Sequence, residues 1–237
     1  MNTLTQDEIN RYNRHLIIPE FNIEHQEKLK GAKVLVVGVG GLGSPLVTYL
    51  TAAGVGTIGI IDDDIVSESN LQRQVIYSQN DVGLSKVDCA EKRMKGINPN
   101  VNVIKHASKL TKENAEEIIS EFDIVCDGTD NYEARYTIDD ICADQHKPYI
   151  YGSIAEFKGQ ASVFHYGIGK SYRDLYPEAP QEKVKKDIGV IGALPGIIGS
   201  IQANETIKII SGLGETLDGR LLLFDALTMK FTVLGLE

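Results

Sequence analysis

The chain contains 237 residues, of which 42% are hydrophobic and 24% are charged, and only 7 are proline. This length is enough for one large domain with a substantial core, and the composition excludes extended disorder. The 24 basic and 33 acidic residues give a net charge of −9, which argues against binding to nucleic acid or to an anionic membrane surface.

The cysteines and the N-terminus bear on the cellular compartment. Cys89, Cys126 and Cys142 have neither the spacing of a disulfide framework nor that of a zinc site, so we expect reduced thiols in the core. The first eight residues are polar and acidic, unlike an export signal, and no apolar run is long enough to cross a bilayer. We therefore expect a cytoplasmic protein that does not associate with membranes.

The first thirty residues are charged and helix-forming, and we expect short helices packed outside the main sheet. An apolar, β-rich run at 33–37 leads directly into a glycine turn at 38–43, and a helix is expected from Pro45 to about Ala53. A second apolar run at 57–61 ends in three aspartates. A strand, a helix and a second strand in this order form one βαβ unit.

The alternation continues along the chain. We expect a helix over 85–97, a strand over 101–104, a helix that begins at Thr111 and a strand over 123–127. Alternation of this kind predicts a parallel sheet with helices on both faces.

The pattern changes after 149–153. The runs at 160–166 and 220–224 predict strands of a smaller antiparallel portion, and the polar stretch 167–187 predicts a long exposed loop. The predicted fold class is α/β, a Rossmann-like, doubly wound, mostly parallel sheet with a smaller antiparallel C-terminal portion. We expect a single domain over 1–237, made of N-terminal helices (1–30), a nucleotide-binding half (31–150) and a second half (151–237).

The glycine turn has the spacing of a nucleotide-binding motif. Gly38, Gly40 and Gly43 allow a tight turn and close approach of a ligand to the backbone, and the helix that follows favours an anion at its N-terminus. Asp62 ends the second strand, where its carboxylate can accept hydrogen bonds from ribose hydroxyls. The motif is commonest in NAD-dependent oxidoreductases. However, the five histidines are scattered, and we find no convincing catalytic His or Tyr-x-x-x-Lys arrangement.

Three polar side chains downstream are suited to a phosphate chain. If 69–74 is helical, Asn70 and Arg73 project from one face, so that an amide and a guanidinium reach the same phosphates. Lys86, just inside the next helix, adds a second cation. Each of the three, taken alone, is also compatible with a solvated surface position.

An aspartate follows the strand at 123–127. Ligands bind at the carboxyl ends of strands in open α/β sheets, and Asp130 is therefore suited to hold Mg²⁺ against triphosphate oxygens. The alternative is that Asp130 caps the helix expected over 131–143, since a short polar residue before a helix is usually a cap.

Together these residues make the chain similar to the ThiF/MoeB/HesA family of bacterial proteins, which are related to ubiquitin-activating enzymes. The resemblance extends through almost the whole chain and rests on Arg11-Tyr12-Asn13-Arg14, Gly38-Val39-Gly40-Gly41-Leu42-Gly43, Ala53-Gly54-Val55-Gly56, 69–74, 127–131, Gly159-Gln160 and Leu194-Pro195-Gly196. It implies the E1-like fold of the activating enzymes and the binding of ATP and Mg²⁺. It further implies adenylation of the C-terminal carboxylate of a small ubiquitin-like sulfur-carrier protein, with release of pyrophosphate.

The resemblance also implies residue roles. Asp62 would hold the ribose, Asn70, Arg73 and Lys86 the phosphates, and Asp130 the magnesium. The glycine turn, Gly41 included, and Asn131 would belong to the same ATP site. Arg14 would reach the triphosphate from the other subunit of a homodimer. Catalysis would then consist of positioning and charge neutralisation, and no protein nucleophile would be required.

The chain departs from the family at two places. Many relatives carry two Cys-x-x-Cys pairs that bind zinc, whereas the first pair's position here reads Ser171-Tyr172-Arg173-Asp174, so we expect no zinc and some other support for 174–180. Some relatives carry a cysteine where this chain has Lys185-Lys186-Asp187, so we expect a separate sulfur donor. Lys183, Lys185 and Lys186 are candidates for docking an acidic carrier.

The segment 172–177 resembles the short thiamine-branch members of the family. We therefore expect a ThiS-type carrier that ends in Gly-Gly and serves thiamine thiazole synthesis, with 151–237 as the half that faces it. Three alternatives stay open: the same reaction on a MoaD-type carrier for molybdopterin synthesis, a catalytically silent partner that binds a carrier, and an NAD-dependent oxidoreductase.

Overall fold

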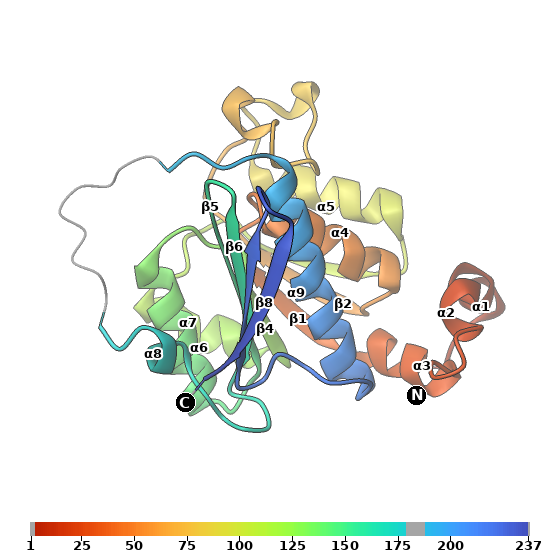
Figure 1. Ribbon diagram of the computed structural model, residues 1–237. Coiled ribbons are helices and arrows are strands. Elements are labelled where there is room, and N and C mark those ends of the chain that lie inside the picture. The colour runs from red at the N-terminus through yellow and green to blue at the C-terminus, as the bar shows by residue number, and fades with distance from the viewer. Residues whose placement is uncertain (1–2, 179–187, 237) are drawn as a thin grey trace.

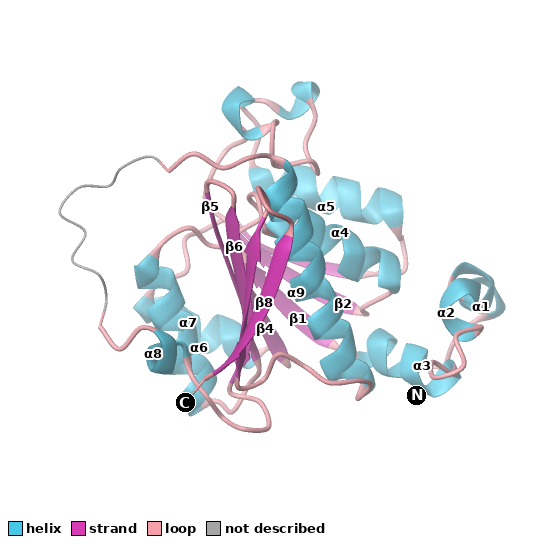
Figure 2. Ribbon diagram, in the orientation of Figure 1, coloured by secondary structure: helices cyan, strands magenta, loops and turns pink. Residues whose placement is uncertain are grey.

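The computed structural model describes residues 3–178 and 188–236 and contains an eight-stranded sheet with the order β3-β2-β1-β4-β5-β6-β7-β8 (Figure 2). In this order, neighbouring strands from β3 through β2, β1 and β4 to β5 are parallel. Neighbouring strands from β5 to β8 are antiparallel. The strands are β1 (Lys33–Val37), β2 (Thr57–Ile61), β3 (Asn102–His106), β4 (Ile124–Asp127), β5 (Tyr149–Ala155), β6 (Lys158–Phe164), β7 (Arg220–Asp225) and β8 (Lys230–Gly235). The predicted α/β class and the antiparallel C-terminal portion are confirmed.

Helices cover both faces of the sheet (Figure 1). One face carries α4 (Gly43–Ala53), α5 (Lys86–Ile97) and α9 (Ala193–Ser211), and the other carries α6 (Lys112–Ser120), α7 (Tyr132–Asp144) and α8 (Tyr172–Leu175). The N-terminal helices α1 (Gln6–Arg11), α2 (Asn13–Leu16) and α3 (Ile23–Gly31) lie outside the sheet, as predicted. No helix in the described part of the chain is long and apolar enough to cross a membrane.

The central strands are apolar on both faces because both faces are covered. In β1, Val34 and Val36 join the core cluster under α4 and α9, whereas Leu35 and Val37 join the cluster under α6 and α7. All four side chains are buried. This two-sided burial explains why β1 reads as a continuous apolar run rather than as an alternating one.

Several elements differ from the sequence-based expectations. The polar stretch 167–187 contains α8, whose Tyr172 is fully buried, so the prediction of one long exposed loop is wrong for this part; 179–187 lie outside the described residues. The helix considered over 69–74 is a single 3-10 turn, η1 (Glu68–Asn70), and a second such turn, η2 (Gln79–Asp81), follows. Neither α9 nor β8 was predicted.

The first helix is fixed to the rest of the chain by a buried carboxylate. Glu8 is 4% exposed, accepts a hydrogen bond from the Thr5 amide, and pairs with the Lys30 ammonium at 2.7 Å. Burial raises the pKa of Glu8, but the hydrogen bonds from Lys30 and Thr5 outweigh burial and hold that pKa below its ordinary value.

Replacement of Glu8 tests this attachment. Because the pKa of Glu8 is lowered on folding, its contribution to stability is present at neutral pH and is lost as the pH falls through the folded pKa, below 4.5. We expect Glu8→Gln to cost about 1–2 kcal/mol at pH 7 and to flatten the acid limb of the stability profile. Thermal melts from pH 7 to pH 3 measure both effects. The exposed Asp7→Asn is the control, and equal profiles for the two variants would contradict the assignment.

Candidate nucleotide and metal site

The candidate site lies at the point where the strand order reverses, since the chain adds strands first on one side of β1 and then on the other. Strand β1 has β2 on one side and β4 on the other, and the loops after these three strands meet at one edge. Gly38 and Gly128 pack backbone to backbone there: the Gly128 amide donates to Val37 O at 2.7 Å, and a Cβ on Gly128 would lie 2.3 Å from Gly38 O. Gly38 also has φ of 86°. Ligands of open α/β sheets bind in this position.

The glycine turn closes onto the first turn of α4. A Cβ on Gly43, the first residue of α4, would lie 2.0 Å from Gly38 O, so only glycine fits. The N-cap residue Leu42 offers no side-chain hydrogen bond, whereas Ser44 Oγ donates to Gly40 O. The Ser44 amide donates to Gly40 O at 2.9 Å and Pro45 has no amide hydrogen, so in this first turn the Gly43 amide is the one left for an anion among the described contacts. Gly41 packs against Pro195 of α9.

Asp62 holds the glycine turn from the second strand. Its Oδ2 accepts the Val39 amide and its Oδ1 accepts the Asp64 amide, both at 2.9 Å. Burial raises the pKa of Asp62, against the lowering effect of Lys86. The buried Lys86 ammonium lies 2.7 Å from Asp64 Oδ2 and 3.9 Å from Asp62 Oδ1. The predicted ribose acceptor and one predicted phosphate cation therefore lie in direct contact.

Asn70 and Arg73 lie in the segment around η1 and are half-buried. Asn70 Oδ1 accepts the Ser67 amide, and Arg73 Nη1 donates to Ser69 O at 3.0 Å. The guanidinium has five N–H donors, so this one bond leaves others for a ligand.

The sequence analysis assigned no role to Gln74 of the same segment. Gln74 is 4% exposed and its amide lies against Gly40; its Oε1 is buried and has no hydrogen-bond partner among the described residues. An unpaired buried acceptor is costly unless a ligand supplies the donor. Its position at the end of the motif 69–74 was the available signal.

Asp130 follows β4 and is exposed. The cap of α7 is Asn131, whose Oδ1 accepts the Ala134 amide at 2.9 Å, so the alternative that Asp130 caps this helix is wrong. The other acid of the loop, Asp127, is fully buried and bound by protein donors. Asp130 therefore offers the one exposed carboxylate of this loop, and carboxylate oxygen is a ligand that Mg²⁺ prefers.

Helix α2, which carries Arg14, lies outside the sheet and away from the strands that carry the other predicted site residues (Figure 1). Arg14 is exposed on α2, and the preceding Tyr12 packs at the far end of α4, where a Cβ on Gly54 would lie 2.3 Å from the Tyr12 hydroxyl. Eleven residues of α4 separate this end from the glycine turn, which corresponds to about 16 Å. The fold does not bring Arg14 together with the other site residues within one chain.

The region where relatives carry the first cysteine pair is held by hydrogen bonds. Ser171 and Asp174 form the capping box of α8. The buried Asp139 carboxylate accepts the Tyr172 amide at 2.8 Å and lies 2.7 Å from His165 Nε2. The sequence had predicted only that some other support was needed, and these contacts provide one.

The three thiols are buried and form no disulfide. Burial raises the pKa of Cys126 to about 12, and the hydrogen bond between Cys126 and Thr206 partly opposes this effect. A thiol of this kind is a poor nucleophile at neutral pH. The expectation of core thiols is confirmed.

Comparison with known proteins places these features in context. A ThiF family model matches residues 12–237. The probable molybdopterin-synthase adenylyltransferase of Porphyra purpurea is 48% identical over 97% of this chain and 61% of its own length. The sulfur carrier protein adenylyltransferase of Thermus thermophilus is 43% identical over 96% of this chain and 87% of its own. The chain spans about three fifths of the length of the first curated relatives it matches.

A solved structure has the same fold. The crystal structure of E. coli MccB with ATP has a TM-score of 0.87, with 22% identity, and the match covers 96% of this chain and 71% of that one. At this identity the likeness concerns the fold alone, and it agrees with the doubly wound sheet described above.

Paired substitutions on α7 test the support of α8. Asp139→Ala leaves the Tyr172 amide without an acceptor inside the core, and we expect a loss of about 2–3 kcal/mol in the free energy of unfolding. Asp140→Ala removes the exposed pair with Arg173, and we expect about 0–1 kcal/mol. Urea unfolding of the two variants provides the measurement. Equal losses would show that Asp139 does not hold α8.

Proposed function

Because the chain belongs to the ThiF family, we propose that it is an ATP-dependent adenylyltransferase acting on a ubiquitin-like sulfur-carrier protein. In the proposed reaction, AMP is joined to the C-terminal carboxylate of the carrier and pyrophosphate is released. The observation that carries this proposal is the meeting of three loops at the β1/β4 edge. The glycine turn, the contact of Asp62 with Lys86, and the exposed Asp130 belong to neighbouring strand ends.

The nucleotide would lie over the glycine turn. The glycine turn and the Gly43 amide at the start of α4 would receive phosphate oxygens. Asp62 would accept the ribose hydroxyls with lone pairs that the Val39 and Asp64 amides leave unused. Lys86 would exchange its Asp64 partner for a phosphate oxygen. The Asp64 side chain is 67% exposed, so its carboxylate is solvated again when it is released. Asn70 and Arg73 would contact the same phosphates from the η1 segment.

Asp130 would hold the magnesium ion, with Asn131 beside it. When bound, Mg²⁺ neutralises charge on the triphosphate. The chain's own residues suit that role because Asp127 is saturated by protein donors, whereas the Asp130 carboxylate faces solvent.

The reaction needs no protein nucleophile. A carboxylate oxygen of the carrier attacks the α-phosphorus of ATP, a new C–O–P link forms, and the bond from the α-phosphorus to the pyrophosphate oxygen breaks. Both reactants are anionic, so the protein contributes orientation and positive charge. The buried cysteines fit this scheme, and sulfur would come from a separate donor.

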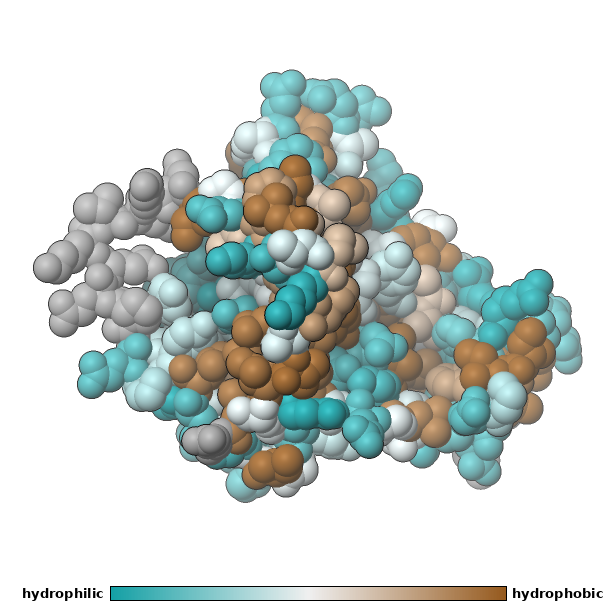
Figure 3. Space-filling view, in the orientation of Figure 1, coloured by the Kyte–Doolittle hydropathy of each residue, from teal (hydrophilic) through white to brown (hydrophobic). Residues whose placement is uncertain are grey.

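A second copy of the chain would supply Arg14. Exposed apolar side chains follow α2 in the chain, up to the start of α3, and Figure 3 shows apolar surface on this side of the molecule. They are Ile17, Ile18 and Ile23, which are 58%, 45% and 49% exposed. A homodimer that covers these side chains would bring Arg14 to the partner's site. Within one chain, the length of α4 separates Arg14 from the site.

The carrier would dock on the C-terminal half. The outer strand β8 exposes Phe231, Val233 and Leu234, and Figure 3 shows apolar side chains gathered over this part of the sheet. Our first candidate is a ThiS-type carrier ending in Gly-Gly. A MoaD-type carrier is the second candidate, and the similarity to the probable molybdopterin-synthase adenylyltransferase of Porphyra purpurea favours it. The lysines at 183, 185 and 186 lie outside the described residues.

ATP–pyrophosphate exchange with each carrier tests the function. We expect exchange that requires Mg²⁺ and one of the two carriers. Asp130→Ala should lower the rate about 10²–10³-fold, whereas the exposed Glu133→Gln, three residues away on α7, should leave it unchanged. ATP binding without exchange would favour a silent carrier-binding partner. Binding of NAD in place of ATP would contradict the proposal.

Mixed dimers test the role of Arg14. Arg14→Ala and Asp130→Ala chains, each inactive alone, are co-expressed with different tags. If Arg14 acts across the interface, each mixed dimer contains one complete site, and a random mixture should regain about a quarter of the wild-type rate. Co-expression of two Arg14→Ala chains with the two tags provides the baseline. A mixture no more active than this baseline would contradict action across the interface.

A further inference from the structure

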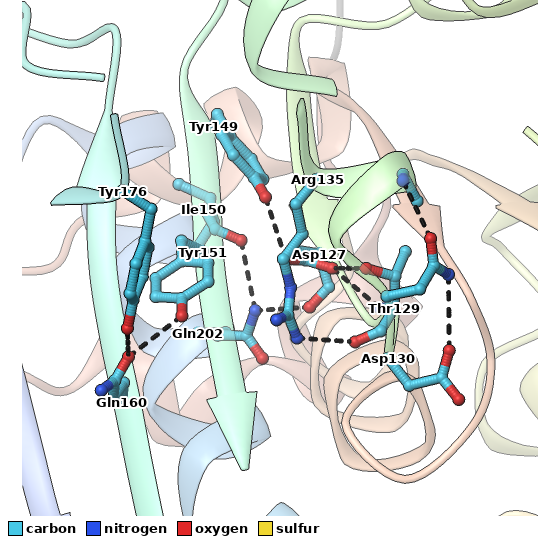
Figure 4. A network of polar contacts seen from close by, with 12 residues as sticks. Asp127, Thr129, Asp130, Arg135, Tyr149, Ile150, Tyr151, Gln160, Tyr176 and Gln202 are labelled. Carbon is cyan, nitrogen blue, oxygen red and sulfur yellow. Dashed lines mark hydrogen bonds and ion pairs between the residues drawn. The ribbon is translucent and has the colours of Figure 1, made fainter. Parts of the chain in front are cut away.

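The buried Asp127 carboxylate organises the loop that ends in Asp130 (Figure 4). Its Oδ1 accepts the amide and the hydroxyl of Thr129, at 2.8 and 2.6 Å. Its Oδ2 accepts Arg135 Nε at 3.2 Å and the Tyr149 hydroxyl at 2.9 Å. The Asp127 main-chain oxygen accepts Gln202 Nε2 at 2.7 Å. Asp127 therefore belongs to the scaffold of the loop and has no free lone pair directed at a ligand.

Arg135 connects Asp127 with Thr129, the two ends of the short segment before Asp130. It lies in the first turns of α7, is 7% exposed, and donates from Nη2 to Thr129 O at 3.1 Å as well as from Nε to Asp127. The rings of Tyr132 and Tyr151 lie 5.9 and 5.6 Å from its guanidinium carbon. One planar group thus spans the buried Asp127 carboxylate and the partly buried carbonyl that immediately precedes Asp130.

The other side of Asp130 is fixed by α7 itself. Asn131 caps the helix, and its Nδ2 lies 3.4 Å from Asp130 Oδ1. The loop is therefore held before Asp130 by Arg135 and after it by the helix cap. Asp130 is the exposed residue between them, and its backbone has little freedom to move.

We propose that Arg135 is a positioning residue for the metal-binding carboxylate of Asp130, an inference that rests on the proposed function. Arg135 touches neither ATP nor metal in this role. Its guanidinium holds the Thr129 carbonyl, and this contact keeps the Asp130 carboxylate at the strand end where the ion would bind. Groups that orient a metal ligand typically change metal affinity about 10–100-fold when they are removed.

The test uses Arg135→Lys. A lysine retains the positive charge beside the buried Asp127, so the fold is preserved, but a single ammonium cannot reproduce the fork that spans Asp127 and Thr129 O. Removal of the charge would leave Asp127 unpaired in the core and is avoided for that reason. The matched control is Tyr149→Phe, which takes a donor from the same Asp127 oxygen and leaves Thr129 O untouched.

Magnesium dependence of ATP–pyrophosphate exchange is the first readout. We expect Arg135→Lys to raise the Mg²⁺ concentration for half-maximal exchange about tenfold or more, and to recover most of the wild-type rate at saturating Mg²⁺. Tyr149→Phe should keep the wild-type half-saturation. Wild-type magnesium dependence in Arg135→Lys would overturn the proposal, and Arg135 would then be a charge partner of Asp127 only.

Hydrogen exchange of the ligand-free chain is the second readout, and it does not depend on activity. We expect the Thr129 amide, which donates to Asp127 Oδ1 at 2.8 Å, to exchange at least fivefold faster in Arg135→Lys than in Tyr149→Phe. If the wild type catalyses no ATP–pyrophosphate exchange with either carrier, the proposed function fails. The hydrogen-exchange measurement then decides the inference alone. Unchanged protection of the Thr129 amide in Arg135→Lys would overturn it.

Discussion

The candidate site depends on the backbone contact between Gly38 and Gly128. A Cβ on either residue would overlap the main chain of the other loop, so neither position admits a side chain without movement of the sheet edge. The contact places the turn after β1 against the loop after β4, and the Asp62 carboxylate then joins the loop after β2 by holding the Val39 amide. Three strand ends thus form one surface, on which the positions of the polar groups follow from the backbone.

The two buried cations at this surface are each paired with a carboxylate before any ligand arrives. Lys86 is paired with Asp64 and lies near Asp62, and Arg135 is paired with Asp127. The two pairs differ in what they allow. Asp64 is exposed and can return to water, so Lys86 can change partners at low cost. Asp127 is fully buried, so Arg135 cannot be released without leaving an uncompensated charge in the core. The first arrangement suits a ligand-binding cation, and the second suits a structural one.

Sequence patterns predicted the elements whose signals are local. Strands β1 and β2 and the turn between β1 and α4 are apolar runs interrupted by glycines, and their bounds follow from composition. Helix α9 was missed because its first turns contain Pro195, Gly196 and Gly199, which look like a loop. The structure explains Gly199, since a Cβ there would lie 2.6 Å from Leu42 O of the neighbouring turn. The roles of Gln74 and Arg135 depend on partners far along the chain or on backbone geometry, which no local pattern records.

The same network connects the two halves of the chain. Tyr151, which faces Arg135, donates its hydroxyl to Gln160 Oε1 at 3.0 Å, and Tyr176 donates to the same oxygen at 3.1 Å (Figure 4). Tyr176 is the C-cap residue of α8, and its main-chain oxygen accepts a hydrogen bond from the Tyr136 hydroxyl at 2.7 Å. Aromatic side chains with polar tips can fill this volume and satisfy each other's hydrogen bonds at the same time. Packing of this kind orders the region after β6 through the core of the domain, whereas a zinc site would order it from cysteine ligands alone.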